Sequence, residues 1–156
     1  MKGQVADNDS ATHYDLGVAY KEMGLLPDAV GEFETAGRDA ARECMCFAMI
    51  GLIYLEQSQL DRAAEAYVRA LSAQQKTVEQ EMSLYYDLGN VYEMKGKNQD
   101  ALYYFQKIAR RDPGYRDVAD RIQQLQPPPA AQAPSAARAV NDDEFDRVFD
   151  DLFESK

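Results

Sequence analysis

Three segments of the chain repeat one another, and this self-similarity constrains the fold more than any other feature. The segments are HYDLGVAYKEMGLLPDAVGEF, FAMIGLIYLEQSQLDRAAEAY and YYDLGNVYEMKGKNQDALYYF. Their matching glycines, Gly17, Gly51 and Gly89, stand 34 and 38 residues apart. A period of this length is typical of arrays in which each unit buries its apolar face against a neighbour. The sequence therefore predicts a stack of similar units rather than one central core.

Each glycine is followed at a fixed distance by an alanine and, four residues later, by an aromatic residue. These pairs are Ala29 and Phe33, Ala63 and Tyr67, and Ala101 and Phe105. Glycine within a helix costs about 1 kcal/mol relative to alanine. We therefore expect the glycines to permit close approach of a paired helix, with the alanines as the small partners across that contact. The aromatic side chains are expected to fill the space between successive repeats.

This pattern resembles the tetratricopeptide repeat, a helix–turn–helix unit with the signature W-x2-L-G-x2-Y, then A-x3-F, then P. The third repeat alone keeps the final proline, Pro113. The signature's tryptophan, leucine and tyrosine sites are occupied in the three repeats by His13, Leu16 and Tyr20, by Phe47, Ile50 and Tyr54, and by Tyr85, Leu88 and Tyr92. The resemblance covers about residues 10–125. It implies an all-α, right-handed superhelix of three repeats, at about 10–43, 44–81 and 82–113.

Further segments surround the repeats. Residues 1–9 are expected to be a flexible N-terminus. The stretch GYRDVADRIQQL places apolar residues on one helical face and predicts a capping helix at 114–125. Residues 126–139, rich in proline and alanine, predict an extended linker. Four extra residues separate the second and third repeats, and they lengthen either the helices or the turn.

The last segment, residues 140–156, combines acidic and large apolar side chains. Seven carboxylates surround an apolar stripe with the spacing of one helical face, formed by Phe145, Val148, Phe149, Leu152 and Phe153. A lone helix of this length is marginal in water, so we expect it to form when its apolar face is covered. It docks either in the groove of this chain or of a sister chain, or on a separate partner protein. A plain solvated acidic tail is the third alternative.

Composition excludes several classes of function. A formal net charge of −10 disfavours nucleic acid and direct membrane binding. The opening MKGQVADNDS does not read as a secretory signal, and no stretch is apolar enough to cross a bilayer. The two cysteines, Cys44 and Cys46, are expected to be small core or groove residues in a reducing compartment. The sequence thus predicts a cytoplasmic protein.

No chemistry-bearing constellation is recognisable in the sequence. The single histidine, His13, falls at a repeat packing position, and there are too few soft ligands for a zinc site. A glycine-rich phosphate loop and a nucleophile turn are also missing from the sequence. We therefore expect a protein that is not an enzyme and has no catalytic residue, cofactor or metal site.

The resemblance implies that the first helix of each repeat lines a concave surface. The candidate groove residues are Tyr14, Val18, Met45, Met49, Leu52, Leu55, Tyr86, Asn90 and Met94. Helical spacing places Asp15, Glu22, Ala48 and Asp87 on the same surface. Flexible methionines suit a surface that adapts to a partner's side chains, which predicts a groove for a hydrophobic helix or peptide. The alternative is that these residues only close a tight superhelix over themselves. Chaperone-binding relatives hold an acidic peptide with lysines, arginines and asparagines on this face, where the present chain has acids, aliphatic residues and methionines, with Asn90 as the chief polar exception.

Together these features predict an adaptor or scaffold that binds proteins. The repeats look bacterial and are similar to modules of cytoplasmic scaffold proteins, including those of motility and type IV pili. The alternative is a self-assembly module, such as a homodimer, with the tail exchanged between chains. The chain is also expected to be a piece of a longer protein.

Overall fold

The computed structural model describes residues 9–126, and within them it contains helices and no strand. The elements are α2 (Ser10–Glu22), α3 (Leu26–Ala36), α4 (Glu43–Glu56), α5 (Leu60–Leu71), α6 (Val78–Met94), α7 (Asn98–Arg111) and α8 (Val118–Leu125). The all-α fold expected from the repeats is confirmed. Residues 1–119 and 120–156 form two units, and the first is described below.

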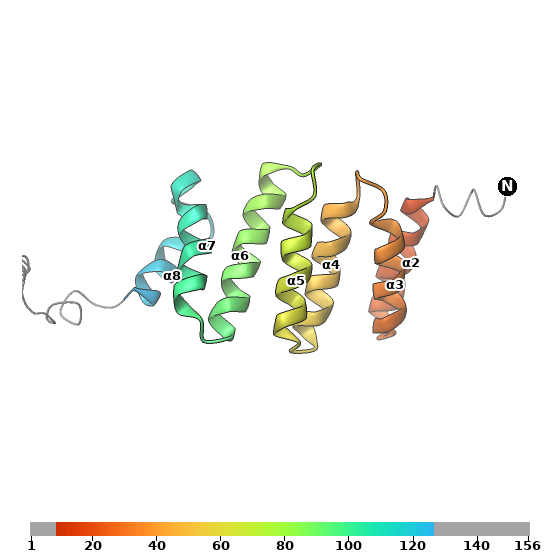
Figure 1. The fold of residues 1–156 in the computed structure, drawn as a ribbon, viewed down its shortest axis with the longest axis horizontal. Coiled ribbons are helices and arrows are strands. Elements are labelled where there is room, and N and C mark those ends of the chain that lie inside the picture. The colour runs from red at the N-terminus through yellow and green to blue at the C-terminus, as the bar shows by residue number, and fades with distance from the viewer. Residues whose placement is uncertain (1–8, 127–156) are drawn as a thin grey trace, which may run out of the picture. The chain divides into compact units, whose positions relative to one another are not determined.

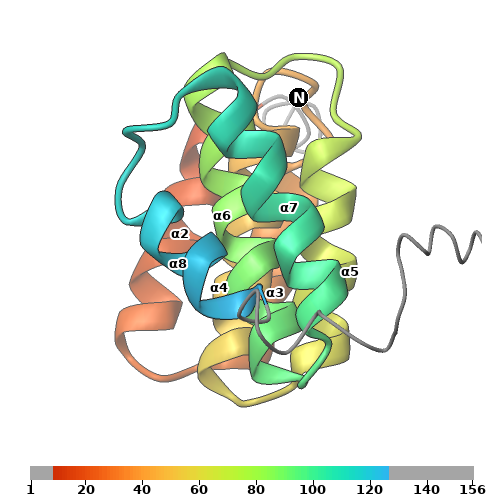
Figure 2. The ribbon, with the colours of Figure 1, turned by 90° about the vertical axis from the view of Figure 1, so that its left-hand side faces the viewer.

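Helices α2 to α7 form three hairpins, in which α2 packs on α3, α4 on α5 and α6 on α7 (Figure 1). Each hairpin turn contains one residue in the left-handed backbone region, Gly24, Ser58 or Gly96, with φ of 80°, 60° and 79°. This conformation favours glycine, which accounts for the glycine seven residues after the repeat glycine in two of the units. The long axes of α2 to α7 run in roughly the same direction (Figure 1 and Figure 2).

Within each hairpin the repeat glycine lies directly beneath an aromatic ring. A Cβ atom on Gly17 would lie 2.7 Å from Cε1 of Phe33, and one on Gly51 would lie 2.6 Å from Cε1 of Tyr67. Gly89 has the same relation to Phe105. The glycines therefore permit close approach, as expected. The rings pack on the glycine of their own hairpin, and Phe33 and Tyr67 also share buried clusters with the first helix of the next repeat, as the sequence suggested. The alanine and the aromatic residue are four apart and share one helix face, so both turn toward the first helix.

Successive hairpins are joined by contacts of each first helix with the preceding second helix. Ile50 and Ile53 of α4 share a buried cluster with Ala29, Phe33 and Ala36 of α3. Similarly, the α6 residues that share a buried cluster with α5 alanines and Tyr67 are Leu84, Leu88 and Val91. Each repeat thus buries its apolar face on its neighbour, as the nearest-neighbour arrangement of repeat proteins requires.

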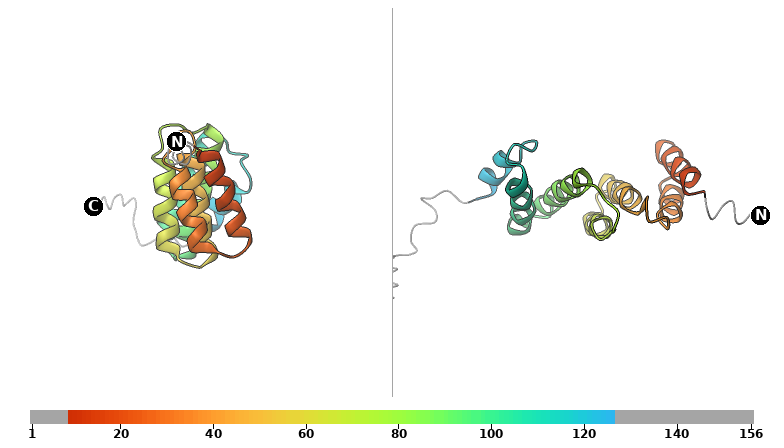
Figure 3. Two further views of the ribbon diagram at one scale, coloured as in Figure 1. Left: turned by 90° about the vertical axis from the view of Figure 1, so that its right-hand side faces the viewer. Right: turned by 90° about the horizontal axis from the view of Figure 1, so that it is seen from above.

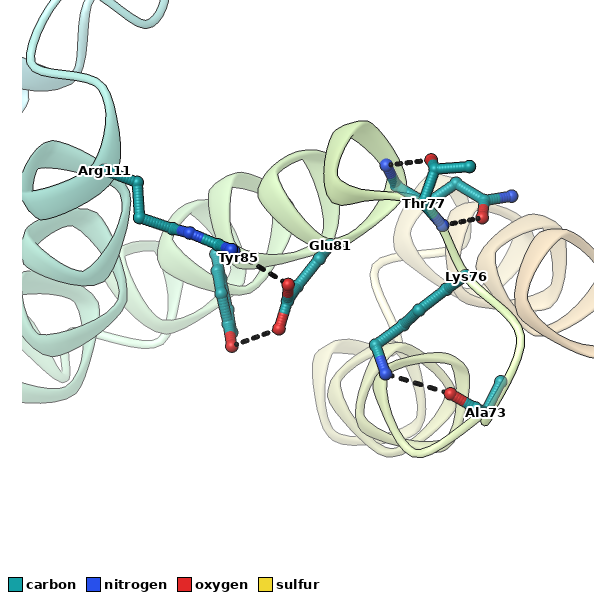
Figure 4. Close-up of polar contacts among 7 residues, drawn as sticks. Ala73, Lys76, Thr77, Glu81, Tyr85 and Arg111 are labelled. Carbon is teal, nitrogen blue, oxygen red and sulfur yellow. Dashed lines mark hydrogen bonds and ion pairs between the residues drawn. The ribbon is translucent and has the colours of Figure 1, made fainter.

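The four extra residues between the second and third repeats lie in helices. The connections 37–42 and 72–77 have the same length, while α5 is one residue longer than α3 and α6 begins three residues earlier, relative to its glycine, than α4 does. A capping box fixes the start of α6, because the Thr77 hydroxyl accepts the backbone N–H of Gln80 and the Gln80 side chain accepts that of Thr77 (Figure 4).

Polar contacts tie the extended first turn of α6 to its surroundings. Arg111 Nη1 donates to Glu81 Oε1 at 2.8 Å, and the Tyr85 hydroxyl donates to the other oxygen at 3.0 Å (Figure 4). The Arg111 hydrogen bond lowers the pKa of Glu81. In the preceding connection, Lys76 donates to the carbonyl of Ala73 at 2.9 Å. The longer α6 therefore has contacts of its own with α7.

Several expectations lie partly or wholly outside the described residues. The helix expected from residue 114 begins at Val118 in the structure, after a turn in which Arg116 has a φ of 43°. The linker from residue 127, the terminal helix and residues 1–8 are outside the described part. The tail anchors outside it are Phe145, Val148, Phe149, Leu152 and Phe153.

Candidate functional site: the first-helix face

Helices α2, α4 and α6 follow one another along one side of the stack, and α3, α5 and α7 along the other (Figure 3). We call the exposed side of α2, α4 and α6 the first-helix face. The candidate groove residues that lie half-buried on these three helices are Tyr14, Val18, Met45, Met49, Leu52, Leu55, Tyr86 and Asn90. Met94, at the end of α6, is more open, with 59% of its surface exposed. These side chains thus keep part of their surface accessible.

The centre of the first-helix face is an apolar strip on α4. Met45 and Met49 pack against the buried cluster of the first two repeats, against which Tyr14 and Val18 of α2 also pack. Leu55 packs against the cluster that the second and third repeats share. Residues 45, 49, 52 and 55 follow one helical stripe, so the strip runs along α4 and borders both neighbouring hairpins.

A polar group interrupts this apolar surface where α6 borders α4 and α5. Asp87 is half-buried, and no hydrogen bond or ion pair with any described residue holds its carboxylate. Burial raises the pKa of Asp87 to about 6, and the Arg116 guanidinium offsets only part of this effect. In the first repeat the equivalent carboxylate, Asp15, is exposed. The two acids of the shared YDLG motif therefore stand in different environments.

The hydroxyl of Tyr67 lies near Asp87. Tyr67 is only 2% exposed, and among residues 9–126 nothing hydrogen-bonds its hydroxyl. Burial raises its pKa, and the charges of Asp87 on α6 and Glu56 on α4 raise it further. Sequence reasoning missed this hydroxyl. The available signal was a tyrosine where the other repeats have Phe33 and Phe105.

The buried carboxylate has a consequence for stability. Because the pKa of Asp87 is about 6 in the folded protein and its ordinary value is 3.8, the folded state binds the proton more readily between these pH values. Stability is therefore lost as the pH rises through this window. We expect Asp87→Asn to raise the free energy of unfolding by about 1–2 kcal/mol at pH 7.5 and by close to nothing at pH 4. Urea denaturation at both pH values measures this, and an unchanged or lower stability at pH 7.5 would contradict it.

The borders of the first-helix face are charged. Lys21 of α2 pairs with Glu56 of α4 at 3.5 Å, and Asp15 and Glu22 are exposed. Arg116 stacks over the ring of Tyr86, with 4.8 Å from its guanidinium carbon to the ring centroid. Lys21 is thus neutralised by Glu56, and the carboxylates of Asp15, Glu22 and Asp87 outnumber the remaining cation of this set, Arg116. This arrangement differs from a clamp for an acidic peptide.

Clefts also lie on the opposite side, between α3 and α5. One of about 310 Å³ is lined by residues including Leu26, Val30 and Tyr54. Another, of about 250 Å³, includes Phe47, and the Arg69 guanidinium lies 4.2 Å from the centre of that ring. Acidic and basic side chains line the second cleft in equal number, so its charge favours no class of ligand.

The two cysteines belong to the buried clusters, and the histidine lies between two helices. The Cys44 and Cys46 thiols are buried, and burial raises the pKa of Cys46 to about 11. His13 Nδ1 lies 2.6 Å from Glu32 Oε1, between α2 and α3. Within residues 9–126 no three histidine, cysteine or carboxylate side chains gather where they could hold a metal ion. The same residues include no helix with the length and apolar character that crossing a membrane requires.

Comparison with known families and structures agrees with the hairpin geometry. The family model of the tetratricopeptide repeat matches residues 48–116. Together with the fold, this decides the classification. The chain contains tetratricopeptide repeats. No curated protein matches it in sequence.

Solved tetratricopeptide repeat structures share the fold at low sequence identity. MamA is 22% identical with a TM-score of 0.63, over 78% of this chain and 69% of MamA. The N-terminal domain of stress-induced protein-1 from C. elegans is 12% identical with a TM-score of 0.69, over 77% and 96%. PilF of Pseudomonas aeruginosa is 21% identical with a TM-score of 0.62, over 78% of this chain and about half, 54%, of PilF. At these identities the likeness establishes the fold alone.

Proposed function

We propose that the chain is an adaptor or scaffold that binds a helical, apolar segment of another protein on its first-helix face. Tetratricopeptide repeats are protein-interaction modules, so this role follows the general use of the fold. The observation that carries the proposal is the half-buried strip of Met45, Met49, Leu52 and Leu55 on α4. An amphipathic helix that binds along such a strip gains about 25 cal/mol of binding free energy for each Å² of apolar surface that it buries. The proposed role is non-catalytic.

Flexible apolar side chains favour binding over simple closure of the superhelix. If the strip only completed the core, its members would be as buried as Ile50 and Ile53, which are 3% and 0% exposed. They instead keep accessible surface, and Leu52 belongs to neither buried cluster of the described residues. The methionine side chain is flexible and polarizable, so it adapts to varied partner side chains.

The acidic tail is proposed as a second recognition element that binds a separate protein. Its seven carboxylates would meet Asp15, Glu22 and Asp87 if it lay on the first-helix face, and like charges at short range repel. The apolar stripe headed by Phe145 is then free to act as a bait in the helix-in-groove mode. The cytoplasmic location, the bacterial origin and a link to motility or type IV pili stay predictions.

Truncation after Gln126 distinguishes a tail that binds a separate protein from a tail that docks on its own repeats. We expect the truncated chain to have the same thermal midpoint and the same low binding of hydrophobic dyes as the full chain. The reason is that a tail that binds another protein does not stabilise the repeats. Differential scanning fluorimetry and dye titration measure both. A lower midpoint with new dye binding would show self-docking, and a change in mass by light scattering would show the self-assembly alternative.

Partner capture tests the adaptor role. Full-length protein and a variant lacking residues 141–156 are used as baits in extracts of the native organism, and bound proteins are identified by mass spectrometry. The proposal expects two partner sets, one lost with the tail and one retained. Cross-links from the retained set to α2, α4 and α6 support the first-helix face. Cross-links confined to α3, α5 and α7 would contradict it.

A further inference from the structure

We propose that the first-helix face recognises a lysine or arginine side chain of the bound helix, and that Asp87 is the residue that pairs with it. This inference rests on the proposed function and deepens it, because it names the chemistry of the partner. The occupant is a basic amphipathic helix: apolar residues at helical spacing meet the strip on α4, and one long cation reaches the border between α4 and α6.

The first support is the unsatisfied state of the polar groups at this border. An ionised carboxylate that is partly buried without a hydrogen bond is costly, and a buried hydroxyl without a partner costs about 1–3 kcal/mol. Asp87 and the Tyr67 hydroxyl are both in this state among the described residues. An ammonium or guanidinium group can donate to the half-buried Asp87 carboxylate. A bound cation therefore converts the penalty at Asp87 into charge-assisted hydrogen bonds.

The second support is the apolar surface beside this polar point. Met49 and Leu52 lie on α4, which contacts α6 directly. Lysine and arginine carry long methylene stems that cover apolar surface while the charged end reaches a polar group. A short polar side chain could not span the strip in this way. The site therefore suits a long basic side chain on a helix whose other contacts are apolar.

The third support is the balance of charge around Asp87. The groups that interact with Asp87 are Tyr67 on α5 and Arg116 before α8, and Glu56 on α4 carries a further negative charge near the same tyrosine. Glu56 forms an ion pair with Lys21, and the Arg116 guanidinium stacks over the ring of Tyr86. The exposed Asp15 and Glu22 add negative charge along α2. This field attracts a basic segment and disfavours an acidic one, the chain's own residues 141–156 included.

Three synthetic peptides of about 16 residues test the inference on the full-length protein. Two carry the same leucine stripe, one with lysines and one with glutamates on the polar face, and the third is the sequence of residues 141–156. Fluorescence anisotropy at pH 7.5 is expected to give at least tenfold tighter binding of the lysine peptide than of either acidic peptide. In Asp87→Asn the lysine peptide is expected to bind about tenfold more weakly, while the protein stays folded.

A matched control and a pH series make the assignment specific. Asp15→Asn removes the equivalent but exposed acid of the first repeat and is expected to change affinity less than twofold. Lowering the pH to 5 protonates most of Asp87, so the lysine peptide should bind the unmodified protein about tenfold more weakly. The same pH change should leave its binding to Asp87→Asn nearly unaltered.

The possible failures are distinguishable. Equal binding of the lysine and glutamate peptides, unaffected by Asp87→Asn, would overturn the role of Asp87 and leave the first-helix face as a binding surface. Tightest binding of the 141–156 peptide would overturn the basic occupant. Lack of binding by all three peptides would overturn this inference and the proposed function together.

Discussion

Replacing Gly51 by alanine is expected to lower the free energy of unfolding by about 1–2 kcal/mol. The new Cβ atom would lie 2.6 Å from Cε1 of Tyr67, closer than nonbonded carbon atoms can approach. Tyr67 is buried among the alanines of α5, so its ring cannot turn away. Overpacking of this kind costs about 1–3 kcal/mol. The better helix propensity of alanine, worth about 1 kcal/mol, offsets only part of that cost.

Gly31 provides a matched control for this substitution. It lies within α3, and a Cβ atom there would have no neighbour within 4 Å. Gly31→Ala should therefore raise the free energy of unfolding by up to about 1 kcal/mol. Urea denaturation of both variants gives the comparison. If Gly51→Ala proves as stable as Gly31→Ala, the close packing of ring on glycine is not what holds the hairpins together.

Changing Met49 to lysine is expected to weaken binding of a basic amphipathic helix more than tenfold. The lysine removes an apolar contact from the strip on α4 and places a positive charge where a basic partner lies. Met49→Glu removes the same contact but adds attraction for that partner, so its loss should be smaller. Val68→Lys, at a 45% exposed position on α5, is the control and should leave binding unchanged.

The comparison of the two Met49 variants separates apolar contact from charge. Both should fold, because Met49 is half-buried and packs at the edge of the core. Their affinities are measured by fluorescence anisotropy with the same lysine peptide. If the glutamate variant binds more weakly than the lysine variant, the first-helix face does not select a basic partner.

The fold could be predicted from the sequence because the strongest sequence pattern has a steric cause. Gly17, Gly51 and Gly89 are required beneath aromatic rings, so their spacing reveals the hairpins directly. Phe33 and Tyr67 contact the glycine of their own hairpin as well as the next repeat, and the first of these contacts depends on which way a helix face turns. Periodicity alone gives residues that share a face and leaves the partner of that face open.

The candidate site was predictable in outline only. Helical spacing from the glycines identified Met45, Met49 and Leu52 as neighbours on one face. It could not show that Asp15 is exposed and Asp87 half-buried, because both follow tyrosine in the same YDLG motif. Their difference arises from tertiary packing: Asp87 lies near a buried tyrosine of the preceding repeat, whereas the first repeat has no such neighbour in the described residues. The length of α6 likewise depended on a cap at Thr77 that the spacing did not locate.

Methionine methyl resonances provide the most direct test of the first-helix face as a binding surface. Met45, Met49 and Met94 lie on that face, while Met82 is 4% exposed in the core and Met23 is 61% exposed at the end of α2. In full-length protein labelled with ¹³C at the methionine methyl groups, the lysine peptide should shift the signals of Met45 and Met49 strongly. The signals of Met23 and Met82 should stay in place. Saturating peptide that moves Met23 alone, or leaves Met45 and Met49 unchanged, would contradict the account.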